Sequence, residues 1–320
     1  MPSVTRSGAS ALMPENAARE IIKGVANKSA AMQLFRHQKM TRAQTRIPII
    51  SSFPVATFVN GDTGLKALSM MDWTNRYLDA EELAVIVPIP EAVLEDADFD
   101  IEGEIRPQVE EALAIAIDNA VFFGVNKPAS WPTAIVTAAI AAGNTVTRGT
   151  STIDVADDIN EVMKTVELDG YEVDGFWGRV DIKARLRGLR GTDKSFIYQT
   201  EGPANTGVAG AGDEKTLFGE KFIVNRAGLA GFVTGSLLTE LIAGDWSQGV
   251  MGIREDLQVK RLTEASLYNP DGTLAHALAQ QDMIALRFKM RVAWQVPNPI
   301  NRMQATEASR YPFGVLRQPA

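Results

Sequence analysis

The sequence has no cysteine among its 320 residues and only two histidines, His37 and His276. The lack of cysteine excludes disulfides, thiolate nucleophiles, iron–sulfur clusters and cysteine-based zinc sites. Two histidines are too few for a three-histidine metal centre. We interpret His37 as part of a basic segment and His276 as a loop or surface residue, so neither predicts a cofactor site.

Positive charge is also scarce, because 32 Lys and Arg face 39 Asp and Glu, which gives a formal net charge of −7. A general nucleic-acid binder needs a net basic footprint, so this balance argues against that class. The longest apolar stretch, Ala134–Ala142, is too short to cross a bilayer. The N-terminus lacks the pattern of a signal peptide. With 45% hydrophobic residues, the chain can bury the core of one large domain or two ordinary ones.

No complete catalytic motif is present. Gly207 and Gly212 have the spacing of a Walker loop, but Asp213 stands where that loop needs a lysine. The Gly-x-Ser-x-Gly motif of serine hydrolases does not occur. Carboxylates are plentiful, without any sign of a cleft. Asp118 is unusual because it lies in the apolar part of a predicted helix, where it either hydrogen-bonds within the core or reaches another subunit.

Hydrophobic periodicity predicts one long helix and two amphipathic strands. Apolar residues recur at steps of three and four from Ile101 to Val121, and Gly124 suits the end of that helix. Alternation over Met251–Lys260 and Ile284–Val296 is typical of strands with one buried face. Shorter helices are predicted at 14–26, 155–166 and 180–189, strands at 171–177, 221–225 and 230–234, a crossover at 125–150 and a mobile loop at 202–212. The predicted fold class is a mixed α+β protein.

Residues 45–83 do not have the pattern of a core. Thr45–Ile50 is predicted to be extended, since Pro48 biases the residue before it away from helix, and Asn60-Gly61-Asp62 is a turn signal. A hairpin of this length is too long for an ordinary loop. Large apolar side chains on such an excursion favour a partner surface.

Two basic segments leave alternatives open. The first, residues 36–46, is a solvated arm, an arm that lies on an acidic neighbour, or a contact to nucleic acid. The second, residues 179–194, is either a solvated helix face or a source of salt bridges to an acidic strip on an adjoining copy.

Four blocks of sequence occur in a specific order. They are Ile47-Pro-Ile to Trp73; Leu83-Ala-Val-Ile-Val-Pro-Ile-Pro-Glu-Ala-Val-Leu-Glu-Asp96 with the helix that ends at Ala120-Val-Phe-Phe-Gly124; Phe176-Trp177 with Leu186-Arg-Gly-Leu189; and Ala243-Gly-Asp-Trp-Ser247, Val250-Met-Gly-Ile-Arg254 and Asp282-Met-Ile-Ala-Leu-Arg287. In this order, from about Pro14 to Arg302, the chain resembles the tailed-bacteriophage major capsid proteins of the Hong Kong 97 type.

The resemblance implies a Hong Kong 97-like capsid fold of four parts. Residues 1–44 would be an N-terminal arm, and residues 45–82 an extended β-hairpin loop that reaches over a neighbouring subunit. A peripheral domain with a long spine helix would hold residues 83–128 and 246–290. An axial domain would hold residues 129–245 and 291–320, with the 202–212 loop at the centre of a capsomer.

The resemblance also implies a structural protein, not an enzyme, with no cofactor or metal. Copies would form hexamers and pentamers of an icosahedral head that encloses dsDNA without sequence-specific binding, in the virion and, during assembly, in the host bacterial cytoplasm. Other expected partners are a separate scaffold protein, a portal and a candidate decoration protein, and no membrane is involved. The candidate subunit-interface residues are Arg42, Arg46, Phe53, Phe58, Lys66, Met70, Trp73, Arg76, Tyr77, Arg187, Arg190, Arg254 and Glu255.

Two features depart from patterns seen in some members of that family. Some carry a long N-terminal scaffold segment, whereas only about 13 residues precede the first predicted helix here, so we expect a separate scaffold or earlier removal. Some cross-link through a Lys, an Asn and a Glu. Lys66 matches the first, but Gln280 and Arg287 stand near the other two positions, so we expect a non-covalent shell.

Two other interpretations stay open at this point. An encapsulin-like bacterial nanocompartment shell has the same fold, and gene context separates the two: terminase, portal and scaffold genes against a peroxidase or ferritin-like gene. The third interpretation is a soluble enzyme of unknown type, against which the lack of a catalytic constellation argues.

Overall fold

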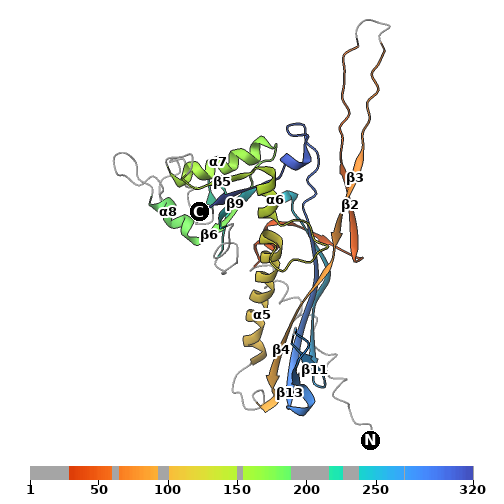
Figure 1. Cartoon of the computed structure of the whole chain (residues 1–320), viewed down its shortest axis with the longest axis vertical. Coiled ribbons are helices and arrows are strands. Elements are labelled where there is room, and N and C mark those ends of the chain that lie inside the picture. Colours follow the sequence, from red (N-terminus) through yellow and green to blue (C-terminus); the bar gives the residue numbers. More distant parts are fainter. Residues whose placement is uncertain are drawn as a thin grey trace.

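A computed structural model describes residues 29–59, 65–92, 101–149, 154–188, 216–225, 238–269 and 271–319. The predicted helix at 14–26, the turn at 60–62, the loop at 202–212 and the strand at 230–234 lie outside these residues. The described chain forms an elongated region, a layered region beside one end of it, and a hairpin that projects away from both (Figure 1).

The elongated region is a four-stranded sheet with a long helix on one face. Its strands are ordered β1-β10-β13-β4, with bounds Arg36–Lys39, Val250–Leu262, Met283–Gln295 and Glu81–Pro90. β1 runs parallel to β10, and the other pairs are antiparallel. Helix α5, Ile101–Asp118, buries Leu113 and Ile117 in one core with Leu286 and Phe288 of β13. The predicted long helix and both amphipathic strands are therefore confirmed.

The long helix ends in a turn of different geometry. Residues Asn119–Phe123 form the π-helical turn η2, and Gly124 follows with φ 71°, a left-handed conformation that favours glycine. Phe122, a residue of this turn, is fully buried, and the centroid of its ring lies 4.1 Å from that of Trp177 in the layered region. The end of the helix thus joins the two regions.

The layered region holds a six-stranded sheet with helices against it. The strand order is β5-β14-β9-β6-β8-β7, with bounds Thr145–Thr147, Phe313–Arg317, Thr239–Gly244, Gly175–Arg179, Glu220–Asn225 and Thr216–Leu217. Helix α7, Val155–Leu168, buries Ile159, Val162 and Val166 against Leu316 and other strand residues. Helix α8, Val180–Arg187, buries Ile182 and Leu186 in the same core. Asp154 caps α7 by accepting hydrogen bonds from two backbone N–H groups.

Three expectations need correction. The crossover predicted at 125–150 contains helix α6, Ile135–Ala142, and strand β5; α6 has alanine even at exposed positions, so it shows no polar stripe. The strand predicted at 171–177 begins only at Gly175. The boundary expected between the peripheral and axial domains, at 290 and 291, falls inside β13, which stays in the four-stranded sheet to Gln295. Of the last two strands of the chain, β13 and β14, only β14 belongs to the six-stranded sheet.

The end of the expected N-terminal arm is part of the core. Helix α3, Ala30–Leu34, buries its first three residues. Phe35 packs against Phe122, Trp246 and Phe313 at centroid distances of 5.9–6.2 Å. His37, in β1, hydrogen-bonds the carbonyl of Met32. Residues 29–40 therefore hold the sheet and the aromatic core together, which the basic composition of this segment did not predict.

Candidate assembly surfaces

The projecting hairpin begins as a regular two-stranded ribbon. β2, Gln44–Ile50, pairs antiparallel with β3, Trp73–Asp79, and the chain continues outward on both sides without a regular ladder (Figure 1). The expectation of an extended 45–50 segment is confirmed. Residues 55–59 have no ladder partner.

The outer hairpin carries large apolar side chains with almost no cover. Phe58, Leu65 and Leu68 are essentially fully exposed, and Met70 and Trp73 are 71% and 62% exposed. Exposure of so many large apolar groups on one excursion disfavours a free monomer, because each leaves apolar surface in water. This part of the hairpin has the composition of a protein–protein contact.

The base of the hairpin is fixed to the body of the same subunit. Leu78 of β3 is fully buried in a small cluster with Met40, Val250 and Ala293. Gln295 donates to the carbonyl of Tyr77 over 3.1 Å. The hairpin is thus anchored at its base and uncovered along its outer part.

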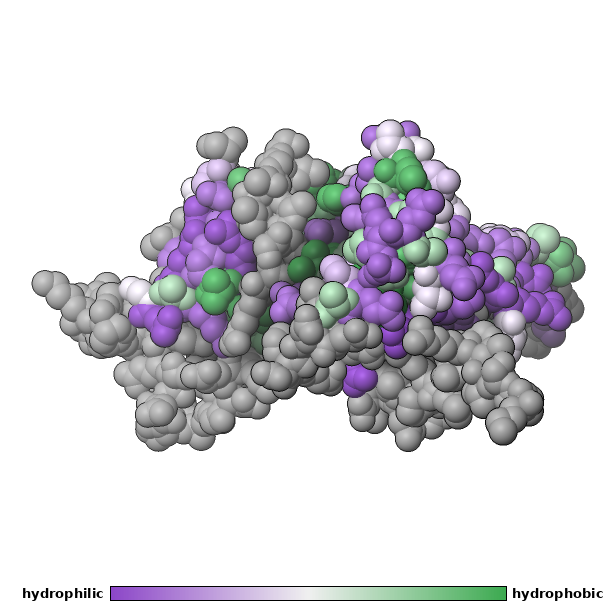
Figure 2. Space-filling view, turned by 90° about the horizontal axis from the view of Figure 1, so that it is seen from below, coloured by the Kyte–Doolittle hydropathy of each residue, from purple (hydrophilic) through white to green (hydrophobic). Residues whose placement is uncertain are grey.

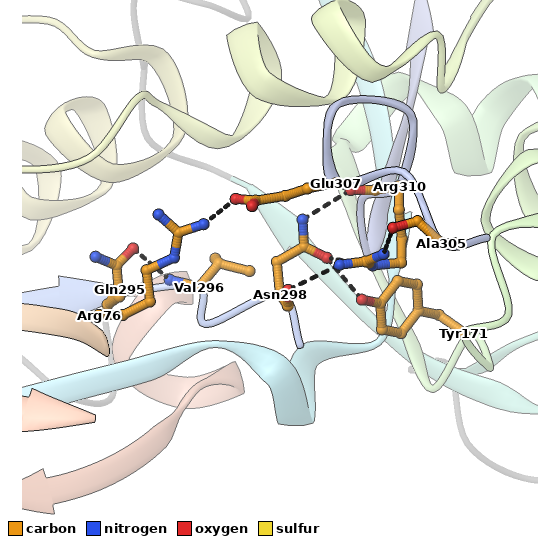
Figure 3. A network of polar contacts seen from close by, with 8 residues as sticks. All are labelled: Arg76, Tyr171, Gln295, Val296, Asn298, Ala305, Glu307 and Arg310. Atoms are coloured by element: carbon orange, nitrogen blue, oxygen red, sulfur yellow. Dashed lines mark hydrogen bonds and ion pairs between the residues drawn. The ribbon is translucent and has the colours of Figure 1, made fainter. Parts of the chain in front are cut away.

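A polar clamp connects that base to the layered region. Arg76 of β3 forms an ion pair with Glu307 of the 3₁₀ turn η5, Glu307–Ser309. The chain from η5 leads directly to Arg310, which is buried. Its guanidinium donates to the carbonyls of Asn298 and Ala305 and to the Asn298 side chain (Figure 3). A fourth hydrogen bond goes to the carbonyl of Gln304.

Asn298 is the centre of the clamp. It has φ 49°, donates to the Arg310 carbonyl over 2.8 Å, and accepts from the Tyr171 hydroxyl over 2.7 Å (Figure 3). Desolvation raises the pKa of Tyr171, which keeps that hydroxyl a donor. These residues could not be found from the sequence, because no motif marks them and their partners Tyr171 and Arg76 lie more than 100 residues away along the chain.

Asp118 joins the N-terminal segment to the long helix. Its carboxylate accepts hydrogen bonds from Ser29 Oγ at 2.7 Å and from the backbone N–H groups of Ala30 and Ala31 at 2.9 and 3.1 Å. Burial raises its pKa to about 6, against the opposing effect of these hydrogen bonds. Of the two alternatives for Asp118, a hydrogen bond within the core is the one that the structure shows.

The basic cluster of the layered region is partly paired within the subunit. Arg148 and Arg185 lie 3.0 and 3.4 Å from the buried Glu240, and Arg179 and Arg185 lie 3.1 and 2.9 Å from Asp181. These contacts use three arginines of the region for internal ion pairs.

The candidate interface residues fall in separate places. Exposed ones are Arg42, Arg46, Phe58, Lys66, Met70, Trp73, Tyr77 and Arg187, and half-buried ones are Phe53, Arg76 and Arg254. The hairpin brings most of them together, whereas Arg187 lies on α8 and Arg254 on β10. Arg190 lies outside the described residues, and Glu255 is placed only by its backbone in β10.

Metal-binding groups of side chains and membrane-spanning helices are absent from the described part of the chain. The described side chains include no group of three His, Asp or Glu residues that would hold a metal ion. No helix within the described ranges is both long and apolar enough to span a membrane. Seen end-on, the coloured surface is largely hydrophilic, with hydrophobic residues in small separate groups (Figure 2).

Comparison with known proteins identifies the class of fold. A solved chain of Microbacterium phage Oxtober96 is 39% identical, with 91% of each chain covered and a TM-score of 0.77. A chain of Mycobacterium phage Adephagia is 27% identical, covers 100% of this chain and 99% of its own, and has a TM-score of 0.76. The structure titled "Capsid of native GTA particle computed with C5 symmetry" shares the fold at 16% identity, with 92% and 91% covered and a TM-score of 0.63. No curated protein that was compared matches the chain.

The fold is that of a viral shell subunit. The family model described as the phage capsid family matches residues 9–302, so the chain belongs to that family. It is a structural major capsid protein, and the alternative of a nanocompartment shell is not favoured.

Proposed function

We propose that copies of this chain assemble into hexamers and pentamers that close an icosahedral head around dsDNA. The observation that carries the proposal is the hairpin, which is rigidly anchored at its base and apolar and uncovered beyond it. Such a surface gains most when it lies over a second copy, because burial removes its apolar area from water. A contact between two different surfaces propagates from copy to copy until rotations close a ring or shell.

The division into parts follows the same proposal. The elongated region would serve as the peripheral domain and the layered region as the axial domain, with the hairpin as the extended loop between neighbours. The candidate interface residues of the hairpin, from Arg46 to Tyr77, would contact the adjoining subunit. The protein would act in the virion after assembly in the host cytoplasm, with a separate scaffold protein, a portal and a candidate decoration protein as partners, and without catalysis.

Electron microscopy of the purified chain, alone and with the scaffold candidate encoded in the same genome, tests the assembly. Closed shells or five- and six-fold rings are the expected result. A chain that stays monomeric in both preparations would overturn the proposal. For the non-covalent shell, boiled and denatured particles should run as one band at the subunit mass; a ladder would contradict it.

A further inference from the structure

The four-stranded sheet has two unlike faces. Leu286, Phe288 and Met290 of β13 are buried in the core shared with α5. Because side chains alternate along a strand, Arg287, Lys289 and Arg291 lie on the opposite face. We call that stretch of the sheet the basic face.

Neighbouring strands add to the charge of the basic face. In register, Lys260 of β10 stands opposite Arg287, and Glu255 stands opposite Arg291. On the other side, Glu82 of β4 lies 3.0 Å from Lys289 and 3.7 Å from Arg291. Four basic residues therefore share this face, and the described carboxylate of Glu82 lies beside only two of them, Lys289 and Arg291. The excess of positive charge is concentrated at Lys260 and Arg287.

Within the described part of the chain, Lys260 and Arg287 have no compensating charge. Neither has an ion-pair partner among the described residues, and the Nε of Arg287 is buried without a hydrogen-bond acceptor there. Like charges directly opposite each other in a sheet destabilise it, and a dry guanidinium nitrogen needs an acceptor. Ile86 of β4, directly opposite Arg287, is 44% exposed. The patch therefore combines unpaired positive charge with uncovered apolar surface.

The exposed part of the basic face ends at the base of the hairpin. Ala293, the next residue on this face beyond Arg291, is buried in the cluster with Met40 and Leu78 at the base of the hairpin. The segment around Arg287 has no such cover from the hairpin base. Lys260 is exposed and Arg287 is half-buried, so another subunit can reach both side chains.

The sequence itself supplies a complementary partner. Residues 91–104 contain seven acidic residues and no lysine or arginine. Apolar residues, among them Val93, Leu94 and Phe99, are interleaved with them. Its negative charge makes this segment complementary to the basic face of a second copy.

We propose that the basic face receives the acidic segment 91–104 of a second copy of this chain. The inference rests on the proposed shell function and names one contact within it. The carboxylates would pair with Lys260 and Arg287, and the interleaved apolar residues would cover Ile86. Opposite charges at such a contact set orientation and exclude wrong registers.

The test reverses each side separately. One chain carries Arg287→Glu with Lys289→Glu, and the other carries Asp96→Lys with Asp98→Lys. Each alone should lower the yield of shells by about tenfold or more, because like charges then meet at every copy of the contact. A 1:1 mixture of the two chains should restore association, since each altered surface then finds its complement. Lys39→Glu with Arg261→Glu is the matched control for the chain with the reversed basic face. It lowers the net charge by the same amount at positions away from the basic face, and it should assemble normally.

The possible outcomes separate the hypotheses. Rescue only when all four substitutions share one chain would place the contact within a subunit and overturn the inference. Reversed variants that assemble normally, or a loss that no mixture rescues, would overturn it as well, and the second result would point to another acidic partner such as nucleic acid. Failure of the unchanged chain to assemble, alone or with a scaffold, would instead overturn the proposed function and this contact with it.

Discussion

Ser29 and Asp118 are 89 positions apart, yet their side chains form a buried hydrogen bond of 2.7 Å. The same carboxylate accepts from two backbone N–H groups at the start of α3. One residue of the long helix thus caps the first described helix, and in doing so it fastens the N-terminal segment to the helix that spans the elongated region.

Removing this carboxylate should loosen the N-terminal segment. Asp118→Ala leaves Ser29 Oγ and two buried N–H groups without an acceptor, and we expect a loss of about 2–4 kcal/mol in the free energy of unfolding. Urea denaturation of the unassembled subunit measures it. Asp157→Ala, at an exposed position in the first turn of α7, should cost less than about 1 kcal/mol. Equal losses in the two variants would contradict the assigned role.

Stability should also depend on pH through Asp118. Its pKa is raised from 3.8 to about 6 in the folded protein, so the fold binds the proton more tightly than the unfolded chain does. The resulting stabilisation is complete below pH 3.8 and is lost as the pH rises through 6, by an amount on the order of 3 kcal/mol.

Comparison with Asp118→Asn isolates this contribution. Asparagine does not titrate, and the other carboxylates contribute equally to the pH dependence of both chains, so their effect cancels in the difference. The unfolding free energy of the natural chain relative to the variant should fall between pH 4 and pH 7. A difference that stays constant across this range would show that Asp118 keeps one protonation state throughout.

The polar clamp predicts that Arg310 cannot be replaced by another cation. Lysine keeps the charge but lacks the planar fork that reaches Asn298, Gln304 and Ala305 together. We expect Arg310→Lys to cost about 2–4 kcal/mol, seen as a lower Tm in calorimetry. Arg302→Lys, at an exposed residue that stacks on Phe53, should cost below about 1 kcal/mol. A Tm for Arg310→Lys no lower than that of this control would rule the clamp out as a stabilising element.

The exposed hairpin predicts a separation of folding from assembly. Phe58→Ser combined with Leu68→Ser should change subunit stability by less than about 0.5 kcal/mol, because both side chains are already in water. The same double variant should fail to form shells in sedimentation experiments. Thr57→Ser, at an exposed position of the same segment, is the control and should assemble. Normal shells from the double variant would show that the hairpin apolar residues are not the contact.

Local sequence predicted the regular elements well where a single face is buried. The alternation of Ile284–Val296 and the helical spacing after Ile101 follow directly from one-sided burial, and the structure has β13 and α5 there. The pattern failed at α6, whose alanines occupy both covered and exposed positions. It also failed at residues 29–40: helix α3 has only five residues, too few to show a period, and the polar side chains of β1 show no buried face.

Composition and periodicity are local properties, so they are enough to predict the fold class, the long helix, the long excursion and the absence of cysteine chemistry. Three other features arise only in the folded chain: what Asp118 binds, how Arg310 and Asn298 hold the hairpin to the layered region, and that Lys260 and Arg287 face each other. Each of these pairings joins strands or turns that are distant along the chain, and their energies depend on burial and on the partner's position. Neither quantity exists until the chain has folded.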